Sequence, residues 1–225
     1  MKRELQDMTL HLEMSKRCLL QCPKCPRTKY TGHYKIDDLP IEHMKTIVNA
    51  TNPRRVTFCG NYGDPLYHPK ILDAVRFLHD SDIPFEFHTN GSGKKVSWWE
   101  EFYNCYENKP YGRKEIKSTV WFGLDGLEDT AHLYRVNTNW REVFDAMCLG
   151  VKMNQEIIWQ WIPFSFNEHQ IEEAKKLAED NGIHLLLRLS DRWDSREGKF
   201  DPLEPTEKFK PTTHHTGNGY IHEKK

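Results

Sequence analysis

The chain has 225 residues, of which 37% are hydrophobic and 29% charged, a composition typical of a globular protein with one sizeable domain. Its 32 Lys and Arg residues nearly balance its 33 Asp and Glu residues, which argues against nucleic acid as a partner. The first residues lack the apolar run of a signal peptide, and the longest apolar stretches, such as HLLLRL near Leu185, are too short to span a membrane. We therefore expect a cytoplasmic protein whose six cysteines stay reduced.

Strand-like and helix-like segments alternate along the chain. Short runs rich in β-branched and aromatic residues predict strands within residues 8–14, 55–60, 83–91, 118–126, 156–164 and 183–189. Apolar residues at helical spacing predict helices within 39–50, 68–80, 97–106, 139–153 and 167–182. Ser97 and Asn167 are expected as N-caps of the helices that they open, and Gly182 can end the last helix.

Repeated strand–helix units imply a parallel sheet with right-handed crossovers. We expect an α/β fold, a partial (β/α)6 TIM barrel with about six strands against eight in the full barrel. Residues 1–190 would form this core domain. Residues 191–225, rich in proline, glycine and charge, are predicted to be an irregular C-terminal tail that serves as a lid or represents a truncated auxiliary region.

Polar and glycine-rich segments follow the predicted strands. In parallel α/β sheets the ligand site lies beyond the carboxyl ends of the strands. Cys18, residues 60–65, residues 89–91, Asp125 and the segment after Gln160 all fall at or just past such ends. The sequence therefore predicts that five loops converge on one rim.

The stretch CLLQCPKC places Cys18, Cys22 and Cys25 at spacings of four and three residues. Three thiolates in one short loop suit a cubane iron–sulfur cluster or zinc. A structural zinc site needs a fourth ligand, for which His11 and His33 are in range. An iron–sulfur cluster held by three cysteines leaves one iron open to a substrate or cofactor, and the spacing alone leaves both metals possible.

This Cys-x-x-x-Cys-x-x-Cys motif after a first strand resembles the signature of the radical S-adenosylmethionine (SAM) superfamily. The resemblance implies that the three cysteines hold a 4Fe–4S cluster whose open iron chelates SAM. It also implies an electron donor such as flavodoxin or ferredoxin, reductive cleavage of SAM to a 5′-deoxyadenosyl radical, and abstraction of hydrogen from a substrate.

Further segments agree with this family. Gly63-Asp64-Pro65 is similar to the end of the family's Gly-Gly-Glu-Pro motif. The segments HTNG and FGLDG match the ends of the third and fourth strands of the family. Arg135 matches an arginine that approaches SAM in relatives with peptide substrates. An inward-facing amide on the fifth strand would suit SAM or substrate. The SAM contacts implied in this way are Gly63, Asp64, Thr89, Asn90, Gly123, Asp125, Arg135 and Gln160.

The chain also departs from the family pattern. Lys24 stands where an aromatic residue often precedes the third cysteine, the Gly-Gly-Glu-Pro segment is lengthened, and Gly123 stands where many relatives have a serine. Three of the implied SAM contacts also have an explanation that involves no SAM. Asp64 and Asp125 are common residue types in turns, and Arg135 is compatible with a solvated charge at a helix end.

The remaining cysteines, Cys59, Cys105 and Cys148, are expected to be buried as small hydrophobic residues. The motifs look nearest to SPASM or twitch-type relatives, which often modify peptides or proteins. No cysteine follows Cys148, so the chain lacks the auxiliary-cluster cysteines of those relatives. A small-molecule enzyme of the deazapurine or nucleotide type is the alternative, and a non-catalytic zinc or iron–sulfur module is the second.

Overall fold

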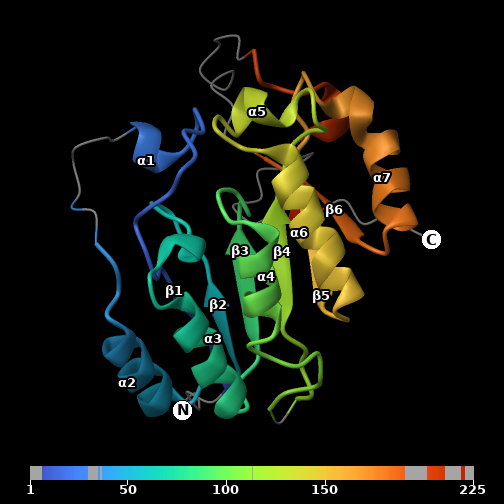
Figure 1. Cartoon of the computed structure of the whole chain (residues 1–225). Coiled ribbons are helices and arrows are strands. Elements are labelled where there is room, and N and C mark those ends of the chain that lie inside the picture. Colours follow the sequence, from blue (N-terminus) through green and yellow to red (C-terminus); the bar gives the residue numbers. More distant parts are fainter. Residues whose placement is uncertain are drawn as a thin grey trace.

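Six parallel strands run side by side in chain order in the computed structural model, which describes residues 7–29, 35, 37–112, 114–190, 202–210 and 219–220 (Figure 1). These strands are β1 (Thr9–Leu12), β2 (Arg55–Phe58), β3 (Phe85–Thr89), β4 (Thr119–Gly123), β5 (Glu156–Trp161) and β6 (His184–Leu189). A two-residue strand, β7 (Gly219–Tyr220), pairs antiparallel with β6. The six predicted strands are thus confirmed, and β7 is an addition that the sequence did not predict.

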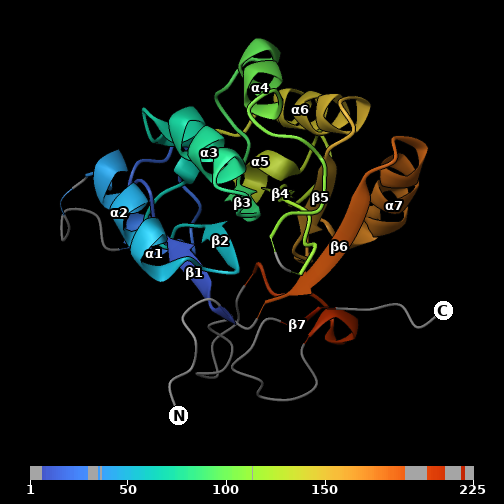
Figure 2. The same cartoon turned by 90° about the horizontal axis from the view of Figure 1, so that it is seen from below.

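Helices cover one face of the curved sheet, and the other face carries none of the labelled helices (Figure 2). The five predicted helices are confirmed as α2 (Ile41–Thr51), α3 (Ile71–Asp80), α4 (Val96–Tyr103), α6 (Trp140–Lys152) and α7 (Ile171–Asp180). Two single-turn helices, α1 (Pro26–Lys29) and α5 (Ala131–Tyr134), lie at the carboxyl end of the sheet. No helix in the described ranges combines the length and the apolar character that crossing a membrane requires.

Alternation along the strands separates the two faces of the sheet. On β3, Phe85 and Phe87 are buried, whereas Glu86 and His88 between them are partly exposed on the helix-free face. The ring of Phe87 packs 4.8 Å from that of Phe102 on α4, centroid to centroid. Aromatic side chains bury large apolar areas, and this layer between sheet and helices forms the hydrophobic core.

The two predicted N-caps are wrong. Helix α4 begins at Val96 after Lys95, so Ser97 lies inside the first turn. Asn167 precedes a 3-10 turn, η3 (Glu168–Gln170), but its side chain makes no capping bond there. Its amide is used instead to close the preceding loop, as described below. Gly182, with a φ of 67°, does follow the end of α7 as expected.

The described part of the C-terminal tail packs beside the loop after β5. The backbone N–H of Ser165 donates to the carbonyl of Leu203 at 3.2 Å, and that of Thr206 donates to Oε2 of Glu168 at 2.9 Å. Phe209, in the 3-10 turn η5 (Glu207–Phe209), joins the hydrophobic core. Residues 191–201, 211–218 and 221–225 of the tail lie outside the described residues, so the lid stays a prediction.

Candidate functional site

The cysteine loop follows β1 and is fastened to two other loops at the carboxyl end of the sheet. The backbone N–H of Gln21 donates to the carbonyl of Val136 at 3.1 Å, and that of Asp64 donates to the carbonyl of Arg17 at 2.9 Å. The Asn137 amide donates to the carbonyl of Leu19 at 3.3 Å. These bonds hold the loop against the segments after β2 and β4, so the predicted convergence of loops occurs here.

Three free, half-buried thiols lie in this loop: Cys18, Cys22 and Cys25. Burial, reinforced by the nearby Asp64 carboxylate, raises the pKa of Cys18 to about 12. Burial also raises the pKa of Cys22, although the Arg135 guanidinium opposes this shift. Charge on Cys22 affects the pKa of Cys18, and charge on Cys25 affects that of Cys22, so the thiols are near neighbours.

Within the described ranges, no three His, Cys, Asp or Glu side chains are arranged as ligands of one metal ion. A 4Fe–4S cubane is bound through three separate irons, so its thiolates stand farther apart than three ligands of a single ion. The donor set, three free thiols on one short loop, fits such a cluster.

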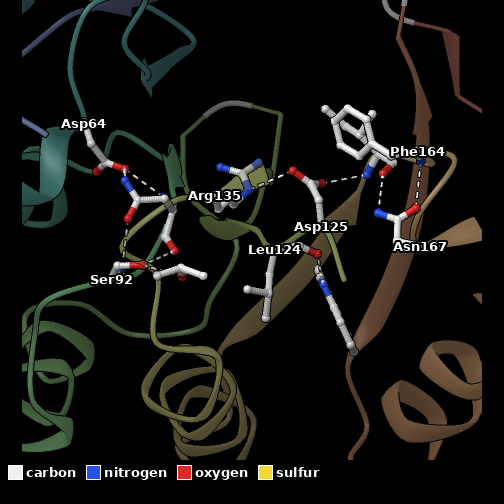
Figure 3. Close-up of polar contacts among 11 residues, drawn as sticks. Asp64, Ser92, Leu124, Asp125, Arg135, Phe164 and Asn167 are labelled. Atoms are coloured by element: carbon white, nitrogen blue, oxygen red, sulfur yellow. Dashed lines mark hydrogen bonds and ion pairs between the residues drawn. The ribbon is translucent and has the colours of Figure 1, made fainter. Parts of the chain in front are cut away.

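Asp64 is a buried carboxylate, 5% exposed, that ties this rim together (Figure 3). Its Oδ1 accepts from the backbone N–H of Leu66 and from the hydroxyl of Thr89, both at 2.9 Å. Its Oδ2 accepts from the backbone N–H of Asn90 at 2.7 Å and from the Asn90 side-chain amide. A carboxylate offers about four lone-pair sites, so protein donors already fill those of Asp64.

Asn90 connects this carboxylate to the cysteine loop. Its Nδ2 lies 3.5 Å from Sγ of Cys18, and its Oδ1 accepts from the backbone N–H of Ser92 at 2.9 Å. The Ser92 hydroxyl lies 2.8 Å from that of Thr138. Gly91, which lies between Asn90 and Ser92 in the chain, has a φ of 73°, a conformation that favours glycine. Ser92 and Thr138 were missed by sequence reasoning, because neither carries a motif.

Gly63 permits a close approach of two backbones. A Cβ atom at this position would lie 2.0 Å from the carbonyl oxygen of Ser15, at the base of the cysteine loop. Only glycine fits there, which gives this motif position a physical reason. In the described part of the chain, the carbonyls of Gly60 and Asn61 accept no hydrogen bond.

Asp125 and Arg135 form a second buried group. Arg135 Nε donates to Oδ2 of Asp125 at 2.7 Å, and the backbone N–H of Ile162 donates to Oδ1 at 2.7 Å (Figure 3). Burial alone would lower the pKa of Arg135, but the negative charges of Asp125 and, to a smaller extent, Cys22 have the larger effect and raise this pKa above its ordinary value. Its terminal nitrogens make no hydrogen bond to any described residue. A charged donor group whose outer atoms are unused within the described residues therefore lies near enough to Cys22 to oppose the rise of its pKa.

The glycine at the end of β4 makes room for this arginine. A Cβ atom on Gly123 would lie 2.6 Å from Nη2 of Arg135. This contact gives a structural reason for a glycine where many relatives have a serine. Gln160 pairs with Gly123 in the register of β4 and β5, and its Oε1 accepts from Nη1 of Arg188 at 3.3 Å. The amide thus lies on the helix-free face, the orientation required for contact with SAM or substrate.

One level below the rim, the helix-free face carries a charged and aromatic group that sequence reasoning missed. Glu86 forms an ion pair with Arg55, accepts from the Thr57 hydroxyl at 3.1 Å and lies 3.7 Å from the His88 imidazole. The His88 ring stacks on Trp121 at 5.0 Å between centroids. Polar residues at alternate positions of β2 and β3 were the available signal.

The loop after β5 is closed by the residue predicted to be an N-cap. The Asn167 side chain is fully buried, its Oδ1 accepts from the backbone N–H of Phe164 at 2.7 Å, and its Nδ2 donates to the carbonyl of Ile162 at 3.0 Å (Figure 3). Because Ile162 also donates to Asp125, this asparagine holds the segment that fixes the second group.

The predicted site residues therefore fall into two adjacent groups. Cys18, Asp64, Thr89 and Asn90 share one hydrogen-bonded network. Asp125 and Arg135 form the other, next to Cys22 and over Gly123. Their contacts with SAM stay predictions. Among the other cysteines, Cys105 is buried as expected, whereas Cys59 and Cys148 are half-buried rather than buried.

No protein-family profile matches the chain, and no curated protein sequence matches it. Solved structures do. SuiB from Streptococcus suis bound to the precursor peptide SuiA aligns with a TM-score of 0.62 at 16% identity, covering 79% of this chain and 38% of SuiB. SuiB bound to S-adenosylmethionine aligns with a TM-score of 0.62 at 15% identity, over 79% and 39% of the two chains.

The enzyme anSMEcpe, solved with AdoMet and the Cp18Cys peptide, aligns with a TM-score of 0.57 at 19% identity, over 87% of this chain and 54% of that protein. SuiB and anSMEcpe are radical SAM enzymes, so the chain shares their partial-barrel fold and the predicted fold class is confirmed. The likeness is one of fold, and the chain spans 38–54% of the length of these proteins.

Proposed function

We propose that this chain is a radical SAM enzyme in which Cys18, Cys22 and Cys25 hold a 4Fe–4S cluster and the adjacent rim binds SAM. When bound, the cluster would supply one electron for cleavage of a sulfur–carbon bond of SAM to methionine and a 5′-deoxyadenosyl radical, and the radical would take a hydrogen atom from the substrate to become 5′-deoxyadenosine. The observation that carries the proposal is the position of Arg135, which Asp125 holds over Gly123 at the end of β4 with its terminal nitrogens unused within the described residues, in a fold shared with a SAM-bound structure.

The two charged ends of SAM would meet different groups. Arg135 suits the carboxylate of SAM, because a guanidinium binds a carboxylate through two parallel hydrogen bonds. An ammonium group needs oxygen acceptors, and the free carbonyls of Gly60 and Asn61 offer them. Asp64 would act indirectly, since its oxygens are already filled by protein donors.

The other predicted residues have positioning roles in this scheme. Thr89 and Asn90 hold Asp64, and Asn90 in turn lies against Cys18. Asp125 orients Arg135, and Gly123 leaves space for it. Gln160 lies on the helix-free face, where an amide can bind either SAM or the substrate.

A peptide or protein is the substrate class that we favour, because SuiB was solved with a precursor peptide and anSMEcpe with a peptide. A small molecule of the deazapurine or nucleotide type remains the alternative. The reaction also requires a reducing partner, such as flavodoxin or ferredoxin.

The test is anaerobic reconstitution with iron and sulfide, followed by addition of SAM and dithionite. We expect a brown protein that forms 5′-deoxyadenosine. Cys22→Ala should abolish this product, because it removes a cluster ligand. Cys148→Ala is the matched control: its thiol lies on α6 and donates to Asn181 at 3.5 Å, away from the cysteine loop, so activity should persist.

The outcome separates the alternatives. A colourless protein that holds zinc and forms no 5′-deoxyadenosine would establish the non-catalytic metal module instead. Arg135→Gln provides a second measurement that needs no turnover. If the guanidinium binds the SAM carboxylate, the Kd of SAM for the reconstituted protein should rise about 10- to 100-fold, because a charge-assisted pair is lost.

A further inference from the structure

Positive charge is concentrated around the cysteines. Between Ser15 and Tyr30 the sequence contains five cations and no Asp or Glu, although the whole chain has a net charge of −1. These cations are Lys16, Arg17, Lys24, Arg27 and Lys29. Two more, Lys94 and Lys95, follow the loop after β3 that carries Asn90. Lys16 is paired with Asp37 at 2.9 Å and Arg17 with Asp38 at 3.1 Å, so the cations that matter most for a local field are Lys94 and Lys95, together with Arg27.

An exposed leucine lies among these cations. Leu19, directly after Cys18, is 46% exposed. A Cβ atom on Gly93 would lie 3.1 Å from Leu19 Cδ2, so the leucine packs against the turn that leads into Lys94 and Lys95. Neither lysine has an acidic partner within the described residues, although the Lys94 ammonium lies 4.9 Å from the centre of the Trp98 ring.

One of two neighbouring arginines completes the surface. Arg27 donates to the carbonyl of Leu20, next to the exposed leucine. The Arg17 side chain, 56% exposed, pairs with Asp38 at 3.1 Å. Because Arg17 is offset by Asp38, we define the Leu19 face by Leu19, Arg27, Lys94 and Lys95. An apolar centre with a charged rim is the usual anatomy of a transient protein interface.

We propose that the Leu19 face docks an acidic one-electron carrier protein. Leu19 would contact the carrier near its redox centre, and the surrounding cations would pair with carboxylates of the carrier. The position of the face supports this partner, because the exposed Leu19 directly follows Cys18 and a carrier seated on it would contact the cysteine loop itself. This inference rests on the proposed function, since a reductive reaction needs such a carrier.

The test compares two double charge reversals. Lys94→Glu with Lys95→Glu changes the face, and Lys175→Glu with Lys176→Glu makes the same charge change on α7, at the opposite edge of the molecule from α1 (Figure 1). Formation of 5′-deoxyadenosine is driven either by reduced flavodoxin or by dithionite, a small reductant that needs no docking surface. Each rate is measured from about 50 mM to about 300 mM salt.

We expect the Lys94/Lys95 variant to need about tenfold more flavodoxin for its half-maximal rate, while its dithionite-driven rate stays within about twofold of wild type. The flavodoxin-driven rate of wild type should fall several-fold over the salt range, and that of the variant less. The Lys175/Lys176 variant should follow wild type. Equal flavodoxin dependence of the two variants would overturn the proposal.

Binding gives a readout that does not depend on turnover. Flavodoxin titrated into the cluster-free protein should broaden the backbone amide signals of Leu19, Lys94 and Lys95, and Leu19→Gln should weaken this binding. If the Lys94/Lys95 variant instead loses binding of a single-stranded RNA oligonucleotide with flavodoxin binding unchanged, the face serves nucleic acid and the proposal is wrong. If wild type forms no 5′-deoxyadenosine with dithionite, the proposed function fails, while this titration still decides the docking.

Discussion

The Asp64→Asn substitution distinguishes a structural anchor from a ligand contact. The substitution replaces one carboxylate oxygen by an NH2 group and keeps the shape of the side chain. At Oδ1 the new NH2 group would face the backbone N–H of Leu66, and at Oδ2 it would face that of Asn90. In either orientation a donor meets a donor, so at least one buried backbone N–H loses its acceptor.

The magnitude follows from these contacts. A buried donor left unsatisfied costs about 1–3 kcal/mol, and the bonds that remain lose the strengthening that a charged acceptor provides. We therefore expect Asp64→Asn to lower the free energy of unfolding by about 2–4 kcal/mol. For a chain of this size each kcal/mol shifts the Tm by about 2–4 °C, so the Tm should fall on the order of 10 °C.

The assay is urea unfolding of the cluster-free protein, followed by tryptophan fluorescence, in the absence of SAM. Asp73→Asn on α3 is the matched control, because its side chain is 58% exposed and makes only a long pair with Arg76 at 3.5 Å. That variant should stay within about 0.5 kcal/mol of wild type. If Asp64→Asn proved equally harmless, the carboxylate would not be an anchor, and direct contact with the SAM ammonium would become the better explanation.

Three further predictions concern single residues. Gly123→Ala should displace the guanidinium of Arg135 and raise the Kd of SAM at least about tenfold. Its effect on the stability of the fold should be smaller, because the added methyl group meets only the end of a side chain, and an unchanged Kd would contradict the contact between Gly123 and Arg135. Burial alone would raise the pKa of Glu86, but the His88 imidazole and the charge of Arg55 have the larger combined effect and lower the pKa below its ordinary 4.5. The ionised Glu86 therefore stabilises the fold above about pH 4.5, and this stabilisation is lost as the pH falls through the lower pKa of the folded state. Urea unfolding from pH 6 to pH 3 should show a steeper loss of stability in wild type than in Glu86→Gln. Asn167→Ala leaves the buried N–H of Phe164 and the partly buried carbonyl of Ile162 without their partner, so it should lower the free energy of unfolding in urea by about 2–4 kcal/mol. Asn167→Asp keeps an acceptor for the N–H and should cost less.

Much of the fold was predictable because its signals are local. The sequence of β3 directly indicates its alternation, in which Phe85 and Phe87 are buried and Glu86 and His88 lie on the other face. Strand–helix repetition then orders the sheet, and the rule for parallel sheets locates the rim. The short strand β7 escaped prediction because two residues carry no periodicity, and its pairing depends on the position of β6.

The site was predictable by position and not by bonding. Motif spacing identified Asp64 and Asn90 as rim residues, but only the folded backbone brings both N–H groups and the amide onto one carboxylate. Asn167 was expected to be an N-cap because asparagine before a helix usually caps it. Tertiary packing overrode that preference, since burying the loop after β5 requires partners for its own backbone groups.

Both buried carboxylates of the rim are used within the protein, and this decides what kind of ligand the rim can take. Asp64 is filled by loop donors, and Asp125 is divided between the Ile162 backbone and Arg135. Within the described residues, the groups without a hydrogen-bond partner include the terminal guanidinium nitrogens of Arg135 and the backbone carbonyls of Gly60 and Asn61. A zwitterion such as the methionine end of SAM matches this set, because it brings a carboxylate for the former and an ammonium for the latter. A purely cationic ligand would leave the Arg135 guanidinium without an anionic partner and would be repelled by its charge, so the rim favours a zwitterion over a cation.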